Sequence, residues 1–318
     1  MWKYVIVGFQ EEYFKYCFAE KRNDSKYLFL NNSMGNGVVS KIQKICCSEI
    51  INKYIRIPLK EIWMNDYTEY GFDKEDKICF VFSKTQSWLL SYKDGKYIKI
   101  LRGLYPKCKI VIYLADLIAT YYEFDIKFFK KVCDYVISYD KNDCLKYKLI
   151  HCELPYYRCE ILEESEIEEF DVFFCGRAKN RINKIYAIYD YLVENNFTCV
   201  FYVTDVKKEY VDKSKNIIYN KKISYEQYLR LLKKSRILIE IIQNNSAGNT
   251  LRMKEALSYS KVLVTNNIEL NLKERDDQVF IYSNVNQIDI EKLRNGMYKS
   301  FLKKDDNDFY IILEKLCN

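Results

Sequence analysis

The chain has 318 residues, of which 49% are hydrophobic and 30% are charged, and its formal net charge is +7. This composition is that of a globular protein, and the length suits two domains of about 150 residues each. No apolar run reaches the ~20 residues of a membrane-spanning helix, and no nucleic-acid motif or dense Lys/Arg cluster accompanies the positive charge. We therefore expect neither an integral membrane protein nor a nucleic acid partner.

Cysteine and histidine usage argues against a metal centre. The sequence has twelve cysteines and one histidine, it lacks a C-x-x-C pair, and Cys46 and Cys47 are adjacent. Adjacent cysteines clamp a metal poorly, and thiols within apolar runs behave as small hydrophobes. The first residues, MWKYVIVGF, read as a strand and not as a signal peptide. We expect reduced thiols, no metal or other cofactor, and a cytoplasmic protein.

Short apolar runs alternate with helical patterns through the first half of the chain. The runs that we predict to be strands are Tyr4–Val7, Tyr27–Leu30, Ile78–Phe82, Cys108–Tyr113 and Asp134–Tyr139. The helical patterns between them include Lys41–Tyr54 and Phe124–Val132. This alternation predicts an α/β fold with a parallel, doubly wound sheet.

An acidic segment with few apolar residues separates the two halves. Residues Arg158–Glu169 (RCEILEESEIEE) follow Pro155, and we interpret them as a connector. The predicted domains are therefore residues 1–157 and 170–318. The last segment, Phe309–Leu316, is an amphipathic pattern that predicts a helix packing back across the domains.

The second half resumes the strand pattern and adds two strand-end loops. Asp171–Cys175 is an apolar run, followed by Gly176, Arg177, Lys179 and Arg181 and then by a helical pattern from Asn183 to about Asn195. A glycine and three cations between a strand and a helix are typical of a phosphate site, although a single such loop is more often merely solvated. Ser224 and Gln227 predict a capping box for a helix over Tyr225–Lys234.

The second loop lies in ILIEIIQNNSAGNTLRMKEALSYSKVLVTNN, which covers residues 237–267. A buried strand ends near Ile242, turn-formers run from Gln243 through Gly248 to Asn249, and a helix begins at Thr250. The start of that helix attracts an anion, and Arg252 in its first turn could grip a diphosphate. Glu255 lies three residues on, where it could bind ribose hydroxyls or form an ordinary ion pair with Arg252.

These segments resemble the C-terminal half of bacterial GT-B glycosyltransferases that build lipopolysaccharide, capsule or exopolysaccharide. The resemblance rests on DVFFCGRAKNRINKIYAIYDYL, SYEQYLRLLKKSRILIEI and SAGNTLRMKEALSYSKVLVTNN, while CDYVISYDKNDCLKYKLIHCELPYY resembles the end of the N-terminal domain. It covers roughly residues 130–285. It implies two Rossmann-like domains facing a cleft, the second of which binds a nucleotide-sugar donor.

By the same resemblance, Arg177 and either Lys179 or Arg181 would bind the donor diphosphate, and Glu255 would bind the ribose. The loop Gln243–Thr250 would face the donor sugar. Many retaining members have two glutamates separated by seven residues, but Ala247 stands at the first position here. The choice between retention and inversion of the anomeric centre therefore stays open.

A catalytic base is the least defined part of the expected site. Asp116 follows the apolar run 110–114 at an expected strand end and is our candidate, whereas His151 reads as a packed junction residue. Residues 1–155 contain 25 Lys+Arg against 19 Asp+Glu, which suits an anionic or lipid-linked glycan acceptor at a membrane surface, or reflects scattered solvated lysines. The expected function is transfer of a sugar from a nucleoside-diphosphate-sugar to a surface glycan. A nucleotide-sugar epimerase and a non-catalytic binding module are the alternatives.

Overall fold

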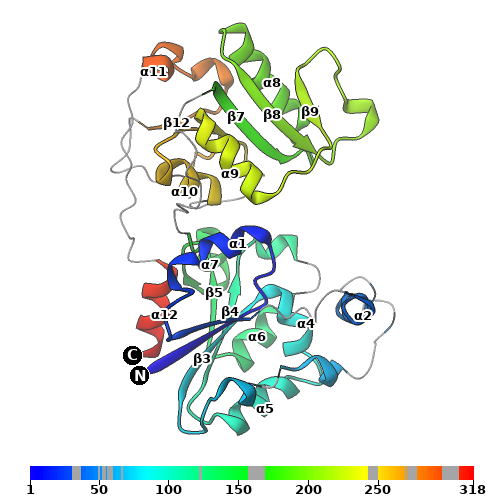
Figure 1. Ribbon diagram of the computed structural model, residues 1–318, viewed down its shortest axis with the longest axis vertical. Helices are drawn as coiled ribbons and strands as arrows, with labels where there is room; N and C mark the ends of the chain where they lie inside the picture. Colours follow the sequence, from blue (N-terminus) through cyan, green and yellow to red (C-terminus); the bar gives the residue numbers. More distant parts are fainter. Residues whose placement is uncertain are drawn as a thin grey trace. The chain divides into compact units, whose positions relative to one another are not determined.

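The computed structural model describes residues 1–30, 37–48, 51, 55, 60–65, 67–121, 124–156, 169–242, 250–268, 270, 278–295 and 308–318. The chain divides into two compact units, one formed by residues 1–155 with 305–318 and the other by residues 156–304 (Figure 1). The expected connector, 158–169, lies almost wholly outside the described residues.

The first unit is a parallel six-stranded sheet in the order β2-β1-β3-β4-β5-β6. Its strands are β1 (Trp2–Val7), β2 (Tyr27–Leu30), β3 (Lys77–Ser83), β4 (Lys109–Leu114), β5 (Tyr135–Ser138) and β6 (Ile150–His151). Its helices are α1 (Glu12–Cys17), α2 (Val38–Cys47), α4 (Ser87–Leu90), α5 (Lys96–Leu104), α6 (Ile126–Val132), α7 (Lys141–Tyr147) and α12 (Phe309–Cys317). All five strands predicted from the first half are present.

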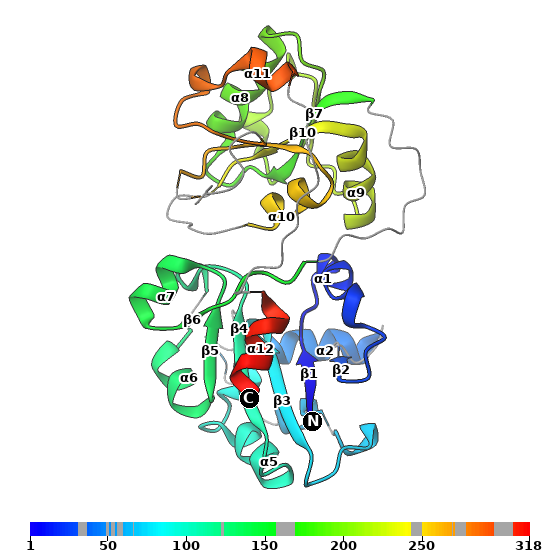
Figure 2. The same cartoon turned by 90° about the vertical axis from the view of Figure 1, so that its left-hand side faces the viewer.

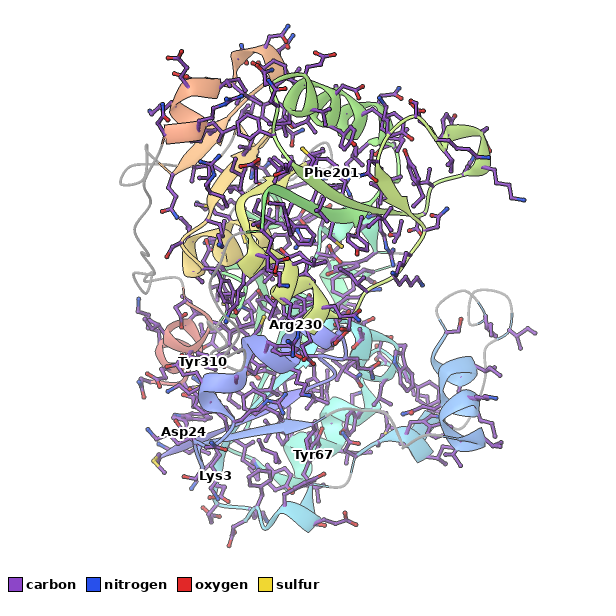
Figure 3. The ribbon with its side chains drawn as sticks, turned by 45° about the horizontal axis from the view of Figure 1, so that its top comes forward. Lys3, Asp24, Tyr67, Phe201, Arg230 and Tyr310 are labelled. Atoms are coloured by element: carbon purple, nitrogen blue, oxygen red, sulfur yellow. The ribbon has the colours of Figure 1, made fainter. Side chains whose placement is uncertain are left out.

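Buried side chains cover both faces of this sheet. On one face, aliphatic residues such as Val5 and Ile112 pack with Leu101 of α5 and Phe129 of α6. An aromatic cluster lies on the other face. In it, the Phe9 ring contacts those of Phe14 and Phe18 edge to face, at centroid distances of 4.8 and 5.2 Å. Tyr67, labelled in Figure 3, is buried in the first of these clusters, with its ring 4.9 Å from that of Phe80.

Helix α12 closes the aromatic face. Phe309 is fully buried, with its ring 5.3 Å from Tyr113 and 5.7 Å from Phe18, and Lys109 Nζ donates to the Leu316 carbonyl at 2.5 Å. Figure 2 shows α12 lying against β3 and β4 of the first unit. The helix is where the sequence predicted one, but we assigned it to the domain 170–318, whereas it packs on the first unit. Its apolar face fits the aromatic layer, which sequence position alone does not reveal.

The second unit is also a parallel six-stranded sheet, in the order β12-β11-β10-β7-β8-β9. Its strands are β7 (Phe170–Arg177), β8 (Cys199–Thr204), β9 (Ile217–Tyr219), β10 (Ser235–Glu240), β11 (Val262–Thr265) and β12 (Val279–Ile281). Its helices are α8 (Ile182–Glu194), α9 (Tyr225–Lys234), α10 (Leu251–Ser258) and α11 (Ile290–Asn295). Short 3₁₀ turns occur in both units over Ala19–Lys21, Lys60–Trp63, Thr68–Tyr70, Lys84–Gln86, Ile118–Thr120, Lys208–Tyr210 and Val285–Gln287.

Helices cover both faces of the second sheet. Helix α8 buries Ile185, Ile188 and Leu192 against the side that carries Phe201, which Figure 3 labels. Helices α9 and α10 contact the opposite side, where Phe173 meets Tyr228 at a centroid distance of 5.3 Å. The predicted capping box of α9 is confirmed, with Ser224 and Gln227 satisfying each other's backbone N–H groups. Both units are therefore doubly wound, as the alternation of elements predicted.

We predict that Phe309→Ala destabilises the first unit by about 3–5 kcal/mol, since it leaves a cavity among aromatic rings. Hydrogen exchange read in β1, β3 and β4 should show faster opening, while β7 and β10 stay protected. Lys315→Ala in the same helix is the matched control and should change little. Unchanged protection in the first sheet would contradict the packing role of α12.

Candidate functional site

The order in which strands are added to the second sheet reverses between β7 and β10. These two parallel strands are neighbours in the sheet, although β8 and β9 lie between them in sequence. From β7 the chain builds outward through β8 and β9, and from β10 it builds the other way through β11 and β12. Ligands of open α/β sheets bind beyond the carboxyl ends of the strands at such a switch point. The residues around Arg177 and Glu240, where these two strands end, are therefore the first place to seek a site.

Arg181 ties the two strand ends together. Its Nη1 donates to the Ile241 carbonyl, beyond β10, and its Nη2 donates to the Arg177 carbonyl of β7 at 2.7 Å. Its Nε is buried and has no hydrogen-bond partner among the described residues. Burial, together with the nearby Arg252, lowers the pKa of the Arg181 guanidinium. An unsatisfied donor beside a second cation is an environment that a bound anion would stabilise.

Arg252 approaches the same strand ends from the first turn of α10. Its Nη2 donates to the Cys175 carbonyl of β7 at 2.6 Å, and its guanidinium lies 4.2 Å from the centroid of the Tyr228 ring. Burial by itself would lower the pKa of Arg252, but Tyr228 and Glu255 outweigh it and raise that pKa above its ordinary value. The side chain as a whole retains 27% exposure.

Glu255 holds that arginine in place. Its carboxylate accepts hydrogen bonds from Tyr225 Oη at 2.7 Å, from Tyr228 Oη at 2.5 Å and from Arg252 Nη1 at 3.0 Å. The Glu255 side chain is fully buried. Of the two roles that the sequence left open, the structure shows the ion pair with Arg252, made in a buried network and not at the surface. Binding of ribose by Glu255 stays a prediction.

A second buried carboxylate, Glu240, supports the start of α10. Thr250 caps the helix by accepting from the Met253 N–H at 3.3 Å, and its hydroxyl donates to Glu240. Thr265 at the end of β11 donates to the other Glu240 oxygen at 2.5 Å. Burial raises the pKa of Glu240, and the two hydroxyl donors oppose that rise. We did not predict Glu240, Tyr225 or Tyr228 as site residues; a lone carboxylate inside the apolar run ILIEII was the one available signal.

The other predicted donor-site residues divide into two groups. Arg177 is 66% exposed and pairs with Asp205 at 3.3 Å, while Lys179 borders a cavity of about 310 Å³ together with Asn183 and Lys207. Both residues lie near the ends of β7 and β8. The remaining three, Gln243, Gly248 and Asn249, lie outside the described residues. Among the predicted residues in the described part, Thr250, Arg252, Glu255 and Arg181 gather at the switch point.

One boundary differs from the prediction. We expected the strand to end at Cys175 and Gly176 to begin the basic loop. Gly176 and Arg177 instead continue β7 and pair in register with Val203 and Thr204 of β8. Because the strand is longer, the loop is shorter and Arg181 stands close to its end.

The first unit has its own switch point, between β1 and β3. Gly8 follows β1 with φ of +83°, and its carbonyl accepts hydrogen bonds from Ser83 Oγ at 2.6 Å and Thr85 Oγ1 at 2.7 Å. A cavity of about 480 Å³ lies between the ends of β1 and β2 and helix α1. Aromatic side chains such as Phe9 and Phe14 line it beside the charged Glu11, Lys15 and Arg22. Its lining combines apolar rings with hydrogen-bonding groups, as is usual for small-molecule pockets.

Asp116 lies just beyond β4 and is exposed, as the prediction of a strand-end carboxylate requires. Its backbone N–H donates to Tyr121 Oη at 2.7 Å. Glu11 precedes α1, and desolvation, with a smaller contribution from the Asp116 charge, raises the pKa of its carboxyl. His151 is half-buried in β6, with Nε2 3.1 Å from the Tyr139 carbonyl oxygen. The structure thus places Asp116 at the strand end where the sequence predicted it, and leaves His151 packed.

Two further features concern metal ions and membranes. No group of three or more His, Cys, Asp or Glu side chains that could hold a metal ion occurs in the part of the chain that the structure describes. Within the same part, no helix is both long and apolar enough to span a bilayer.

No model of a known protein family matches the chain. A curated protein of Plasmodium falciparum (isolate 3D7), PFC0760c, is 24% identical over 190 residues, which cover 56% of this chain. The chain spans only 6% of the length of that relative.

Solved structures give a clearer comparison. An alpha-glucosyltransferase in complex with UDP and a 13-mer DNA containing a HMU base matches with a TM-score of 0.51 and 10% identity, over 83% of this chain and 79% of its own. At this identity the likeness shows the fold alone. The fold is GT-B.

Two further structures are more distant. A DNA-modifying beta-glucosyltransferase has a TM-score of 0.49 at 15% identity, over 92% of this chain and 88% of its own. A UDP-N-acetylglucosamine 2-epimerase from Rickettsia bellii has a TM-score of 0.43 at 13% identity, over 83% and 78% of the two chains.

We predict that Thr265→Val destabilises the second unit by about 1.5–3 kcal/mol. The nearly isosteric change removes a hydroxyl donor from a buried carboxylate and leaves that oxygen unsatisfied. Thermal unfolding should show a lower Tm than wild type. Thr204→Val, a strand-end threonine with no carboxylate contact in the described part of the chain, is the control, and equal shifts in both variants would contradict the role of Glu240.

Proposed function

We propose that this protein is a glycosyltransferase that takes a sugar from a nucleoside-diphosphate-sugar donor. The observation that carries the proposal is the pair of guanidinium groups, Arg181 and Arg252, at the β7/β10 switch point. Both are anchored to backbone carbonyls, so their positions are fixed before any ligand arrives. Arginine suits diphosphate recognition because its planar guanidinium presents several donors to phosphate oxygens.

The same charges would serve the reaction as well as binding. Negative charge grows on the departing diphosphate as the bond to the sugar breaks, and fixed cations stabilise that charge in the transition state. Arg252 meets this requirement because Glu255, Tyr228 and the Cys175 carbonyl prevent it from reorienting. The proposal needs no metal ion, since the arginines supply the positive charge. Arg177 and Lys179, nearer β8, would extend the positive surface beside the same loop.

For the acceptor we propose a surface glycan of the capsule, exopolysaccharide or lipopolysaccharide class, free or lipid-linked. The cavity at the end of β1 supports this choice, because aromatic rings and carboxylates together bind sugars by stacking and hydrogen bonding. Asp116 is the proposed base for the acceptor hydroxyl. The protein would act in the cytoplasm or at the inner face of a membrane.

Calorimetric titration of UDP, GDP, CDP and ADP into wild type and Arg252→Gln tests the donor site. One diphosphate should bind wild type, and the variant should bind it about 10- to 100-fold more weakly, because a charge-assisted contact contributes about 1.5–3 kcal/mol. Arg230→Gln is the matched control, since Arg230 on α9, which Figure 3 labels, pairs with Glu226 at 3.0 Å and both side chains are partly exposed. Absence of binding by all four nucleotides would overturn the proposal.

Glu255→Gln, titrated with the selected nucleotide and with its nucleoside, separates the two roles of that residue. If Glu255 positions Arg252, the variant should weaken binding of the diphosphate about ten-fold and leave the weak binding of the nucleoside unchanged. If Glu255 binds ribose, both ligands lose affinity. Two outcomes would favour the alternative functions. Epimerisation of the nucleotide-sugar without an acceptor would favour an epimerase. Nucleotide binding without turnover on glycan or hydroxymethylated DNA acceptors would favour a non-catalytic binding module.

The proposed base is tested by turnover as a function of pH. Asp116→Asn should reduce turnover by about 100-fold or more, while Asp94→Asn, an exposed loop control, should not. Retained turnover of Asp116→Asn with a shifted pH profile would instead point to Glu11 as the base. The substitution at position 116 removes a repulsive charge, so the raised pKa of Glu11 would fall and the acid limb of the profile would move to lower pH with turnover retained. Full activity with an unchanged profile would exclude Asp116 as the base.

A further inference from the structure

Helix α2 exposes the residues that an amphipathic helix normally buries. Val38, Val39, Ile42 and Ile45 share one face by the 3.6-residue period, and their exposures are 72, 52, 47 and 51%. Gln43, in the same helix, is only 6% exposed. Figure 1 shows α2 at the edge of the first unit, on the side of the sheet that carries α4. Four apolar residues of this helix are thus exposed where an amphipathic helix would bury them.

Helix α5 of the same unit exposes apolar residues in a different way from α2. Helix α5 also exposes two apolar residues, Ile100 and Leu104, at 38 and 45%. Its main apolar face, with Tyr97, Ile98 and Leu101, is buried against the sheet. Isolated exposed hydrophobes of the α5 kind are common, whereas the four exposed apolar residues of α2 lie next to one another on one face, as an apolar stripe.

The size of the stripe limits the partner. A ten-residue helix is ~15 Å long and ~10 Å wide, so its outer face covers on the order of 150 Å². A stable protein–protein interface buries about 800 Å² per partner, so this face alone is too small to hold a second copy of the chain. Binding to a lipid surface requires no such minimum area, because a single amphipathic helix can insert its apolar face at the headgroup boundary.

Charge favours an anionic lipid surface in particular. The helix contains Lys41 and Lys44 and no acidic residue, and the Lys41 side chain is exposed. Residues 1–155 contribute a surplus of six positive charges to the chain. Basic residues beside an apolar stripe bind anionic headgroups while the apolar side chains insert below them.

We propose that α2 docks the protein on the surface of an anionic phospholipid bilayer, with Val38, Val39, Ile42 and Ile45 inserted at the headgroup boundary. Because one short helix gives a weak anchor, the attachment is peripheral and reversible. This proposal does not rest on nucleotide binding or sugar transfer, and its test requires neither activity.

The test is co-sedimentation of the full chain with vesicles of phosphatidylglycerol and phosphatidylcholine in equal parts, and with vesicles of phosphatidylcholine alone. Wild type should bind the anionic vesicles and bind the neutral ones much less. Ile42→Gln/Ile45→Gln should weaken binding to the anionic vesicles by about ten-fold or more, since two inserted side chains are lost. Both positions are exposed, so thermal unfolding should be unchanged in this variant.

Ile100→Gln/Leu104→Gln on α5 is the matched control and should bind the anionic vesicles as wild type does. Lys41→Glu should weaken binding to anionic vesicles only. Failure of wild type to sediment with anionic vesicles, or equal losses in the α2 and α5 variants, would overturn the proposal. So would analytical ultracentrifugation showing a wild-type dimer that Ile42→Gln/Ile45→Gln dissociates, which would identify the stripe as a contact between copies.

Discussion

The hydrogen bond from Arg252 to the Cys175 carbonyl is the interaction on which the candidate site depends. It joins the first turn of α10 to β7, and the ring of Tyr228 beneath the same guanidinium adds α9. Glu255 accepts a hydrogen bond from Arg252 Nη1 and so holds the guanidinium in place. Three elements therefore meet at one cation, Arg252, which is 77 positions from Cys175 in sequence, and the position of that cation follows from the packing of all three. A positive group held in this way pays no ordering entropy when an anion binds.

The buried charges near the switch point are organised in opposed pairs. Arg252 faces Glu255, and the Glu240 carboxylate is held by two threonine hydroxyls close to Arg181 and Arg252. Burying an isolated charge is expensive, and removing one partner of a buried pair leaves the other uncompensated, at about 3–5 kcal/mol. The carboxylates thus allow two guanidinium groups to remain near each other inside a folded domain when no ligand is bound. The need to offset two buried guanidinium groups explains why the site contains the carboxylates of Glu240 and Glu255, which phosphate binding alone would not require.

Local sequence patterns predicted the elements well and the assembly of the site only in part. Ser224 and Gln227 determine a capping box through contacts three residues apart, so the start of α9 could be predicted from the chain. The boundary of β7 could not, because Gly176 and Arg177 stay in the strand through pairing with β8, which is a long-range contact. Glu240 was missed for a related reason. A carboxylate at the end of an apolar strand has meaning only once Thr250 and Thr265 are seen to donate to it. Helix α12 was predicted as a helix, but its attachment to the first unit depends on the aromatic layer around Phe9 and Tyr113.

The contrast between Glu255 and Ala247 clarifies how this site differs from the two-glutamate pattern of many retaining enzymes. Without a carboxylate at 247, the carboxylates of the described part of the site are Glu240 and Glu255, and each accepts hydrogen bonds from protein groups on both oxygens. A carboxylate used in this way positions its neighbours, and contact with a substrate would require it to exchange one of these partners. Arginine is therefore the residue type through which the described part of this site meets an anionic ligand. A ligand with a compact negative charge would fit that arrangement better than a neutral sugar, and under the proposed function the diphosphate of the donor would be the part that the second unit recognises most directly.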